Sequence, residues 1–229
     1  MTHCNTKIIL GITGASGAIY AKHLLRALYH AGVQTHLAIS PLGLRLLHDE
    51  LGLRSASELL AAAGVADQHN NLAHPESNAP IILHSQQNMG ATIASGSFQH
   101  QGMVIAPCSS NSLAAVATAQ SQHLIHRAAY VALKEHRKLI LLHRETPLTL
   151  ADIRNMETLT LMGAVVMPAS PGFYTLPKSI ADMADFMVAR ILDQLGVTHD
   201  LGMRWEDQLN QNRQARKETP QEKQPTQTK

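Results

Sequence analysis

The sequence predicts an α/β protein built on a doubly wound parallel sheet. Short apolar runs alternate along the chain with longer segments in which apolar residues recur every three to four positions. The short runs are apolar at almost every position, which is typical of parallel strands covered on both faces. A glycine-rich turn also follows the first run and precedes the first helical pattern. Together these features predict a three-layer arrangement, with helices on both faces of the sheet.

Six short runs are the predicted strands, and the periodic segments between them are predicted helices. The strands are Lys7–Ile12, Gln34–Ile39, Ile81–His84, Met103–Pro107, Lys138–His143 and Ala164–Pro168. The helices are Gly17–Ala31, Pro41–Glu50, Ser110–Ala119, Leu124–Glu135, Thr149–Met162 and Ser179–Leu195. The second helix has the clearest beginning, because Ser40 is a favourable N-cap and proline suits the first helical position. Between Leu53 and Pro80, weak periodicity predicts a short helix and a loop.

The length and composition predict one domain followed by a polar tail. A chain of 229 residues that is 45 % hydrophobic can bury one sizeable core. We therefore expect a single α/β domain over residues 1–206. From Asp207 onward the chain has no aromatic and no β-branched apolar residue. Residues 207–229 are predicted to be a tail that is disordered or that contacts another subunit.

Charge and composition argue against several classes of function. The net charge is +2, the basic residues are not clustered and only 3 % of residues are aromatic, so nucleic acid is not an expected partner. Two cysteines and the absence of a leader or spanning segment predict no disulfide framework and no membrane span, and we expect a cytoplasmic protein. The histidines lack the spacing of metal ligands, so no metal is expected; they include His123, His126, His136 and His143.

The glycine turn predicts a phosphate ligand. Gly11, Gly14 and Gly17 lie between the first strand and the first helix, where backbone N–H groups converge and the helix dipole favours an anion. Their spacing differs from the G-x-G-x-x-G pattern of dinucleotide sites. Such sites also have an acidic residue about 20 residues further on, at the end of the second strand, where this chain has Ser40. A mononucleotide is therefore favoured over a dinucleotide.

A second polar turn follows the fourth strand. Ser109, Ser110, Asn111 and Ser112 begin the next predicted helix, and a single N-cap would account for only one of these side chains. The others predict a contact with a polar ligand. Because ligands of doubly wound sheets bind at the carboxyl ends of the strands, both turns are expected to face one crevice.

From Lys7 to Trp205 the chain resembles the flavin prenyltransferases of the UbiX family. Six blocks in the family's order carry the resemblance: "GITGASGAIYAKHLL", "ASGSF", "PCSSNSLAAVATA", "LIHRAAYVALKEHRKLILLHRETPL", "GAVVMPASPGFYTLP" and "VARILDQLG". The resemblance implies a flavodoxin-like Rossmann fold. It also implies metal-independent transfer of a dimethylallyl group from dimethylallyl phosphate to N5 and C6 of reduced FMN.

The resemblance further implies partners and an assembly. The product would be the prenylated FMN that UbiD-type decarboxylases use, including the one of ubiquinone biosynthesis. Members of the family form homo-oligomers, with trimers assembled into dodecamers and active sites at the subunit contacts. The choice between dimethylallyl monophosphate and diphosphate as donor stays open.

Site residues follow from the matching blocks. The resemblance assigns FMN binding to Gly14, Ala15, Ser16, Ser40, Ser109, Ser110, Asn111, Ser112 and Arg144. It assigns the prenyl phosphate to Lys134, Tyr174, Arg190 and Arg127. Glu145, Ser16 and Lys134 are expected to act in the reaction, with Glu145 carrying a proton to or from the phosphate. Fixed cations around the departing phosphate would stabilise the transition state more than the ground state.

The same residues also have simpler structural interpretations. Arg127 and Lys134 fit a solvated helix face, and Tyr174 fits packing over a proline-rich loop. Cys108 fits a small buried residue. Met89 stands where some family members have a tryptophan six residues before the serine of "ASGS", which bears on the wall of the prenyl pocket.

Two alternative functions stay open at this stage. The first is a phosphopantothenoylcysteine-decarboxylase-like flavoprotein, which shares the fold and acts through a histidine on the first helix and a later cysteine. This chain has no cysteine after Cys108, which speaks against it. The second is a non-catalytic FMN-binding subunit, which would not need Lys134, Glu145, Tyr174 and Arg190 together.

Overall fold

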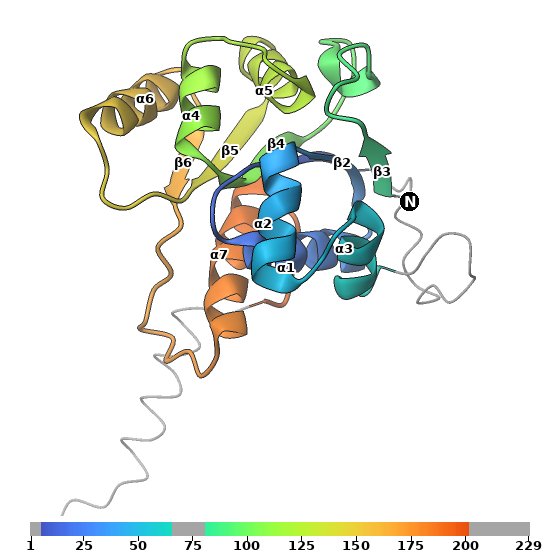
Figure 1. The fold of residues 1–229 in the computed structure, drawn as a ribbon, viewed down its shortest axis with the longest axis vertical. Coiled ribbons are helices and arrows are strands. Elements are labelled where there is room, and N and C mark those ends of the chain that lie inside the picture. Colours follow the sequence, from blue (N-terminus) through green and yellow to red (C-terminus); the bar gives the residue numbers. More distant parts are fainter. Residues whose placement is uncertain (1–5, 66–80, 202–229) are drawn as a thin grey trace, which may run out of the picture.

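The computed structural model describes residues 6–65 and 81–201. Within these ranges the chain forms a six-stranded sheet in the order β3-β2-β1-β4-β5-β6, and every neighbouring pair of strands is parallel. Helices cover both faces of the sheet, as Figure 1 shows. The predicted doubly wound α/β fold with three layers is confirmed.

The elements follow the predicted order closely. The strands are β1 (Lys7–Ile12), β2 (Gln34–Ile39), β3 (Ile81–His84), β4 (Gly102–Cys108), β5 (Lys138–His143) and β6 (Val165–Pro168). The helices are α1 (Ala18–His30), α2 (Pro41–Leu51), α3 (Ala56–Ala62), α4 (Ser110–Ala117), α5 (Leu124–Lys134), α6 (Leu150–Leu161), α7 (Ile180–Leu195) and the short 3-10 helix η1 (Thr92–Ala94). Helix α3 is the short helix expected after Leu53.

Two apolar layers hold the helices on the sheet. On one face, side chains of α1 and α7 such as Leu24, Leu28 and Ile191 pack on alternate residues of β1, β4 and β5. On the other face, α4, α5 and α6 pack on the intervening residues of the same strands. Burying each large aliphatic side chain contributes about 1.5–3 kcal/mol. The two faces together explain why the central strands are apolar at every position.

The sheet has a switch point between β1 and β4. After β1 the chain builds outward through β2 to β3, and it then returns to add β4 on the other side of β1. As a result α1 and α4, which follow these adjacent strands, belong to opposite layers. In such sheets the carboxyl ends of the two strands at the switch point flank a crevice.

Some helix ends differ from the prediction by one or two residues, for identifiable reasons. Gly17 was expected to be the first residue of α1, but it is the N-cap in a left-handed conformation with φ 116°. A side chain there would also meet the Tyr20 ring, 2.8 Å from an ideal Cβ. Thr149 and Ser179 likewise lie just outside α6 and α7, because each is the N-cap of a capping box.

Parts of the sequence prediction lie outside the described residues. The expected boundary at residue 206, the tail 207–229 and most of the loop before Pro80 fall in the ranges 66–80 and 202–229. Within the ranges 6–65 and 81–201, no helix has the length and apolar character needed to cross a membrane.

Buried histidines connect β2 and β3. His36 is 4 % exposed, its Nδ1 lies 2.9 Å from Nε2 of His84, and the two rings are stacked. Phe98 packs edge-on against His36 and carries His100 on its other side. Burial, followed by the charges of His84, Lys7 and His100, lowers the pKa of His36 to about 4. The cluster is therefore packed in its neutral form.

Acid is expected to destabilise the fold through His36. The unfolded chain takes up a proton below pH 6.5, whereas the folded chain takes it up only near pH 4, so stability should fall as pH falls between these values. The loss amounts to up to about 3 kcal/mol for one histidine. Urea unfolding at pH 7.5, 6 and 5 should show a weaker pH dependence for His36→Gln than for the parent. The exposed His136→Asn variant is the control, and an equal slope in all three proteins would contradict the assignment.

Candidate active site

Four polar turns meet at one edge of the sheet. All strands are parallel, so the turns that follow β1, β2, β4 and β5 lie at the same edge, with β1 and β4 adjacent at its centre. These turns contain Gly14 to Gly17, Ser40, Ser109 to Ser112, and Arg144 with Glu145. The structure thus brings together the residues that the sequence assigned to a flavin, together with Glu145.

A buried threonine joins the two central turns. Thr13 is 1 % exposed, and its hydroxyl donates to the carbonyl of Pro107 at 2.8 Å. The same oxygen accepts from the backbone N–H of Ser109 at 3.0 Å. The glycine turn after β1 is therefore fixed against the serine turn after β4 at the switch point.

A carboxylate already occupies the beginning of α1. Glu50, in the last turn of α2, accepts from the backbone N–H of Gly17 at 2.9 Å and of Ala18 at 2.8 Å. The N–H of Ala15 donates to the Thr13 carbonyl. In this structure Glu50 therefore takes the first N–H groups of α1, which are the groups that the sequence predicts for a phosphate.

The beginning of α2 adjoins a cavity. Ser40 is buried and is the N-cap of α2, since its hydroxyl accepts from the N–H of Gly43 at 3.0 Å. Beside it lies a cavity of about 470 Å³, lined by Leu44, Leu83, His84 and other residues of β2, α2, α3 and the loop after β3. Met89 lies in the same loop after β3, and its side chain is exposed. The cavity is largely apolar, with polar groups at the end of β2.

The beginning of α4 is a chain of hydroxyl groups. Ser109 is the N-cap and accepts from the N–H of Ser112, while its own hydroxyl donates to the Ser112 hydroxyl at 3.2 Å. Ser112 is in turn 3.1 Å from Nε2 of His126, whose pKa is lowered to about 4 by burial and then by His123. Asn111 is exposed at the rim. The buried members of this chain are therefore held in fixed positions.

Arg144 and Glu145 lie next to that helix. The backbone N–H of Arg144 donates to the carbonyl of Cys108 at 3.3 Å, and the side-chain Nε of Arg144 is buried without a hydrogen-bond partner. Glu145 is exposed and accepts from the Ser110 hydroxyl at 3.3 Å. A buried guanidinium N–H without an acceptor beside a helix N-terminus fits an anionic ligand.

Lys134 and Arg190 lie away from this edge within the chain. Lys134 is the last residue of α5 and pairs with Glu135 at 2.6 Å, beside Gly96, which precedes β4. This is the amino end of the sheet. Arg190 pairs with Asp193 near the end of α7 and is exposed. Neither cation reaches Glu145 in a single copy of the chain.

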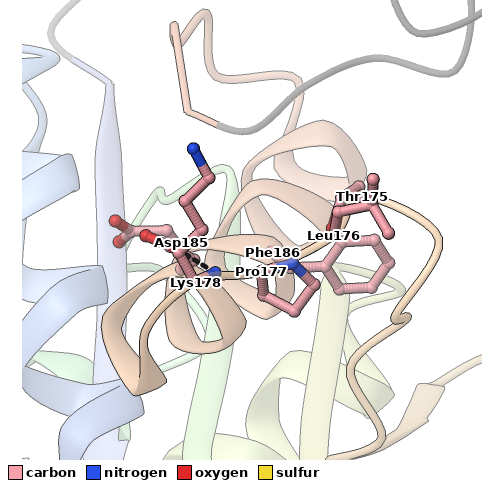
Figure 2. Close-up of a pocket in the computed structure, with 7 residues that line it drawn as sticks. Thr175, Leu176, Pro177, Lys178, Asp185 and Phe186 are labelled. Atoms are coloured by element: carbon pink, nitrogen blue, oxygen red, sulfur yellow. Dashed lines mark hydrogen bonds between the residues drawn. The ribbon is translucent and has the colours of Figure 1, made fainter.

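Arg127 and Tyr174 lie on segments around the crevice. Arg127, in the first turns of α5, lies over the Tyr130 ring at 5.9 Å. Tyr174 packs edge-on against Phe186 in the loop between β6 and α7. Figure 2 shows the adjoining part of this loop, Thr175 to Lys178, against Asp185 and Phe186, around a cavity of about 290 Å³.

Comparisons with known proteins identify the family. A family described as Flavoprotein matches residues 2–192. The flavin prenyltransferase UbiX of Halalkalibacterium halodurans is 39 % identical over 211 residues, which cover 89 % of this chain and 96 % of that protein. The chain belongs to the flavin prenyltransferases. The expected family, fold, enzyme class and flavin cofactor are confirmed.

Solved structures of similar proteins agree with this assignment. The structure of AnUbiX (PadA1) in complex with FMN and dimethylallyl pyrophosphate has a TM-score of 0.76 and 34 % identity, and covers 88 % of this chain and 97 % of its own. A dodecameric FMN-dependent UbiX-like decarboxylase from Escherichia coli O157:H7 has a TM-score of 0.75 and 37 % identity, and covers 87 % and 99 %.

Features of this flavin prenyltransferase do not favour the decarboxylase-like alternative. Cys108 is fully buried, and burial raises the pKa of its thiol to about 12, so it is not a nucleophile at neutral pH. His23 on α1 is buried, with its Nδ1 2.6 Å from the Asp185 carboxylate. Among residues 6–65 and 81–201, no three His, Cys, Asp or Glu side chains are grouped to hold a metal ion.

Sequence reasoning missed two residues that shape the site. Thr13 was not singled out because its partners lie 94 and 96 residues away. Glu50 was missed because its contacts with Gly17 and Ala18 join separate elements. One signal was available: a glutamate in the last turn of a helix opposes the helix dipole, which points to another partner.

Removing the Thr13 hydroxyl should loosen the flavin site. In Thr13→Val the Ser109 N–H loses its partner and the Pro107 carbonyl keeps only the Thr13 backbone N–H, while the volume is kept, at a cost of roughly 1–3 kcal/mol. We expect FMN affinity to fall by about tenfold, because the two turns are no longer held together, which corresponds to about 1.4 kcal/mol. Thr13→Ser, which keeps the hydroxyl, should bind FMN like the parent in a fluorescence titration. Equal affinity of all three proteins would contradict this role.

Proposed function

We propose that this enzyme transfers a dimethylallyl group from dimethylallyl phosphate to N5 and C6 of reduced FMN in the cytoplasm. The prenylated FMN is then the cofactor of UbiD-type decarboxylases, including the one of ubiquinone biosynthesis. The observation that carries the proposal is the pair Arg144 and Glu145 in the turn after β5, where a buried guanidinium Nε–H without an acceptor is followed by an exposed carboxylate that contacts Ser110 of α4. Cleavage of a phosphate ester requires a group that binds the anion and, beside it, a group that carries a proton.

The flavin is proposed to lie across the turns after β1, β2 and β4. Its contacts are Gly14, Ala15, Ser16, Ser40, Ser109, Ser110, Asn111, Ser112 and Arg144. The fit is supported by Gly14, where an ideal Cβ would come within 2.4 Å of Leu42, so the backbone approaches α2 closely. Ser16 is exposed in the turn after β1, and its proposed task is to orient the reacting part of the flavin. FMN supplies the nucleophilic nitrogen and carbon, and the chain supplies orientation and charge.

Glu145 is proposed to move the proton of the reaction. When the allylic C–O bond breaks, the electron pair stays on the phosphate oxygen, and Glu145 gives that oxygen a proton. Arg144 stabilises the same developing charge. A guanidinium that is fixed before the reaction costs no reorganisation at the transition state. General acid catalysis of this kind contributes about 100- to 10,000-fold.

Lys134 and Arg190 are proposed to come from neighbouring copies of the chain. With Tyr174 and Arg127 they are assigned to the donor phosphate, yet Lys134 lies at the opposite end of the sheet from Glu145. Large apolar side chains are exposed on α6, on the loop before α7 and at the first residue of α7, namely Leu150, Ile153, Leu161, Phe173, Leu176 and Ile180. Such surfaces are typical of subunit contacts. A dodecamer built from trimers would bury them and complete the site, and the UbiX-like relative from Escherichia coli O157:H7 is dodecameric.

The direct test is anaerobic incubation of the protein with reduced FMN and dimethylallyl phosphate, followed by mass analysis of the flavin. The parent should add one five-carbon unit to the flavin, and dimethylallyl diphosphate in a parallel reaction identifies the donor. Glu145→Gln keeps the size of the side chain and should still bind FMN. Its rate of product formation should fall by at least about a hundredfold. A parent-like rate in Glu145→Gln would refute the proton-carrying role.

Mixed oligomers test whether Lys134 acts on a neighbouring copy. Lys134→Ala and Glu145→Gln should each be nearly inactive as pure oligomers that still bind FMN. When the two variants are dissociated and reassembled together, some sites combine a native Lys134 with a native Glu145, so activity should return to a measurable fraction of the parent rate. Arg45→Ala, which changes an exposed ion pair on α2, mixed with Glu145→Gln is the control for activity that survives dissociation and reassembly. Mixtures of the two inactive variants that exchange subunits and stay inactive would show that Lys134 acts within its own chain or not at all.

A further inference from the structure

A buried histidine ends the chain of hydroxyl groups at the beginning of α4. His126, in the first turn of α5, is 2 % exposed, and its Nε2 lies 3.1 Å from the hydroxyl oxygen of Ser112. On its other side the His126 ring packs on the ring of His123, with 3.8 Å between the ring centroids. The Nδ1 atom of His126 is buried without a hydrogen-bond partner. The serine turn after β4 is thus joined to α5 through Ser112.

The hydrogen bonds of Ser112 fix the direction of this chain. The Ser109 hydroxyl donates to the Ser112 oxygen at 3.2 Å. Ser112 is 3 % exposed, so its own hydroxyl proton needs an acceptor inside the protein, and the structure provides Nε2 of His126. The chain of donors therefore runs from Ser109 through Ser112 to His126.

Other protonation states of His126 fit this geometry less well. A charged ring would have two N–H groups, and the Ser112 oxygen could accept from only one of them. A neutral ring with its proton on Nε2 would leave both the Ser112 hydroxyl proton and the Nδ1 lone pair unpaired. With the proton on Nδ1, only that N–H is unpaired. Burial and the nearby His123 also lower the pKa of His126 to about 4, which agrees with a neutral ring.

The direction of the chain decides what Ser109 can offer to a ligand. Its proton is directed to Ser112, and one of its lone pairs accepts from the Ser112 backbone N–H at 3.3 Å. A second lone pair remains on this half-buried oxygen. The Thr13 hydroxyl proton is likewise used, by the Pro107 carbonyl. An ionised phosphate can only accept hydrogen bonds, so neither hydroxyl has a proton for it.

We propose that His126 is a positioning residue that turns the Ser109 hydroxyl inward, so that Ser109 accepts from an uncharged N–H or O–H group of the flavin and does not bind its phosphate. The donor group belongs to the flavin ring or to its ribityl chain. The inference rests on the proposed flavin contact of Ser109. It divides the crevice, because the N-cap of α4 receives an uncharged part of the cofactor and the phosphate is bound elsewhere along the edge of the sheet.

The first experiment compares FMN with riboflavin, which lacks the phosphate. His126→Phe keeps a ring of similar size but removes the acceptor for Ser112, so the Ser109 hydroxyl is no longer held inward. We expect the affinities for FMN and for riboflavin to fall by the same factor, about three- to tenfold, which is what one uncharged hydrogen bond contributes. Fluorescence titration with each flavin measures the two factors.

Ser112 tests whether the effect passes along the chain. Ser112→Ala should lower both affinities about as much as His126→Phe does, and His126→Phe should add little in the Ser112→Ala background. Ser112→Thr keeps a hydroxyl and should restore most of the affinity for both flavins. A histidine that only stabilised α5 would instead weaken binding equally with and without the Ser112 hydroxyl.

His100→Phe is the matched control. His100 is also a buried histidine whose Nδ1 has no hydrogen-bond partner, but it precedes β4 and so lies at the opposite end of that strand from Ser109. Whatever stability His100→Phe loses in thermal unfolding, its affinities for FMN and riboflavin should equal those of the parent.

Three results would overturn the inference. These are parent-like affinities in His126→Phe, a loss confined to FMN, and an undiminished further loss from His126→Phe in the Ser112→Ala background. If His126→Phe does not fold, Ser112→Ala and Ser112→Thr carry the same comparison. Equal affinities of these two variants, or a loss for FMN alone in Ser112→Ala, would then contradict the inference.

Ser109→Ala separates this inference from the proposed function. If Ser109→Ala binds both flavins like the parent, the flavin does not contact this hydroxyl, and that part of the proposed function is wrong together with the inference. If Ser109→Ala binds both flavins weakly while His126→Phe binds them like the parent, the flavin contact stands and only the role of His126 is refuted.

Discussion

The site depends on the Thr13 hydroxyl at the switch point of the sheet. Thr13 lies in the turn after β1, and its hydroxyl donates to the Pro107 carbonyl and accepts from the Ser109 N–H, both at the end of β4; the residue is almost completely removed from water. A hydrogen bond in such surroundings costs more to break than one at the surface, because the groups left behind find no water. This hydroxyl fixes the glycine turn against the serine turn. Ser110 of the serine turn in turn donates to Glu145, the glutamate after β5. Precise placement of reacting groups requires a rigid frame of this kind.

The fold could be predicted because the central strands are buried on both faces. Runs such as Lys7–Ile12 and Lys138–His143 have no polar face, which distinguishes them from the amphipathic helices between them. Helix ends were harder, because Gly17, Thr149 and Ser179 look helical in sequence but act as caps. A cap is defined by its backbone conformation, which sequence periodicity does not reveal.

The site was predictable only where its residues follow a strand. Ser40 and Ser109 can be recognised because they are polar residues directly after apolar runs, and Glu145 lies two residues after such a run. Glu50 gives no such signal, because it lies inside a helix and accepts from N–H groups of another element. The place of Lys134 follows from a simple rule that was not applied: a helix after a parallel strand runs back toward the amino end of the sheet, so its last residue lies far from the crevice.

The carboxylate of Glu50 at the beginning of α1 has a consequence for ligand direction. A prenyl transfer to a flavin mononucleotide brings two phosphate esters into one crevice, where they repel each other. Of the helix beginnings at this edge, that of α1 already holds the Glu50 carboxylate, while α2 and α4 begin at the serine N-caps Ser40 and Ser109. We therefore expect the two like charges at separate ends, one near Ser40 and one near Arg144. The reacting atoms of the flavin and of the prenyl donor, which are uncharged, then lie between these two ends. A ligand bound in the opposite orientation would bring its phosphate close to the Glu50 carboxylate.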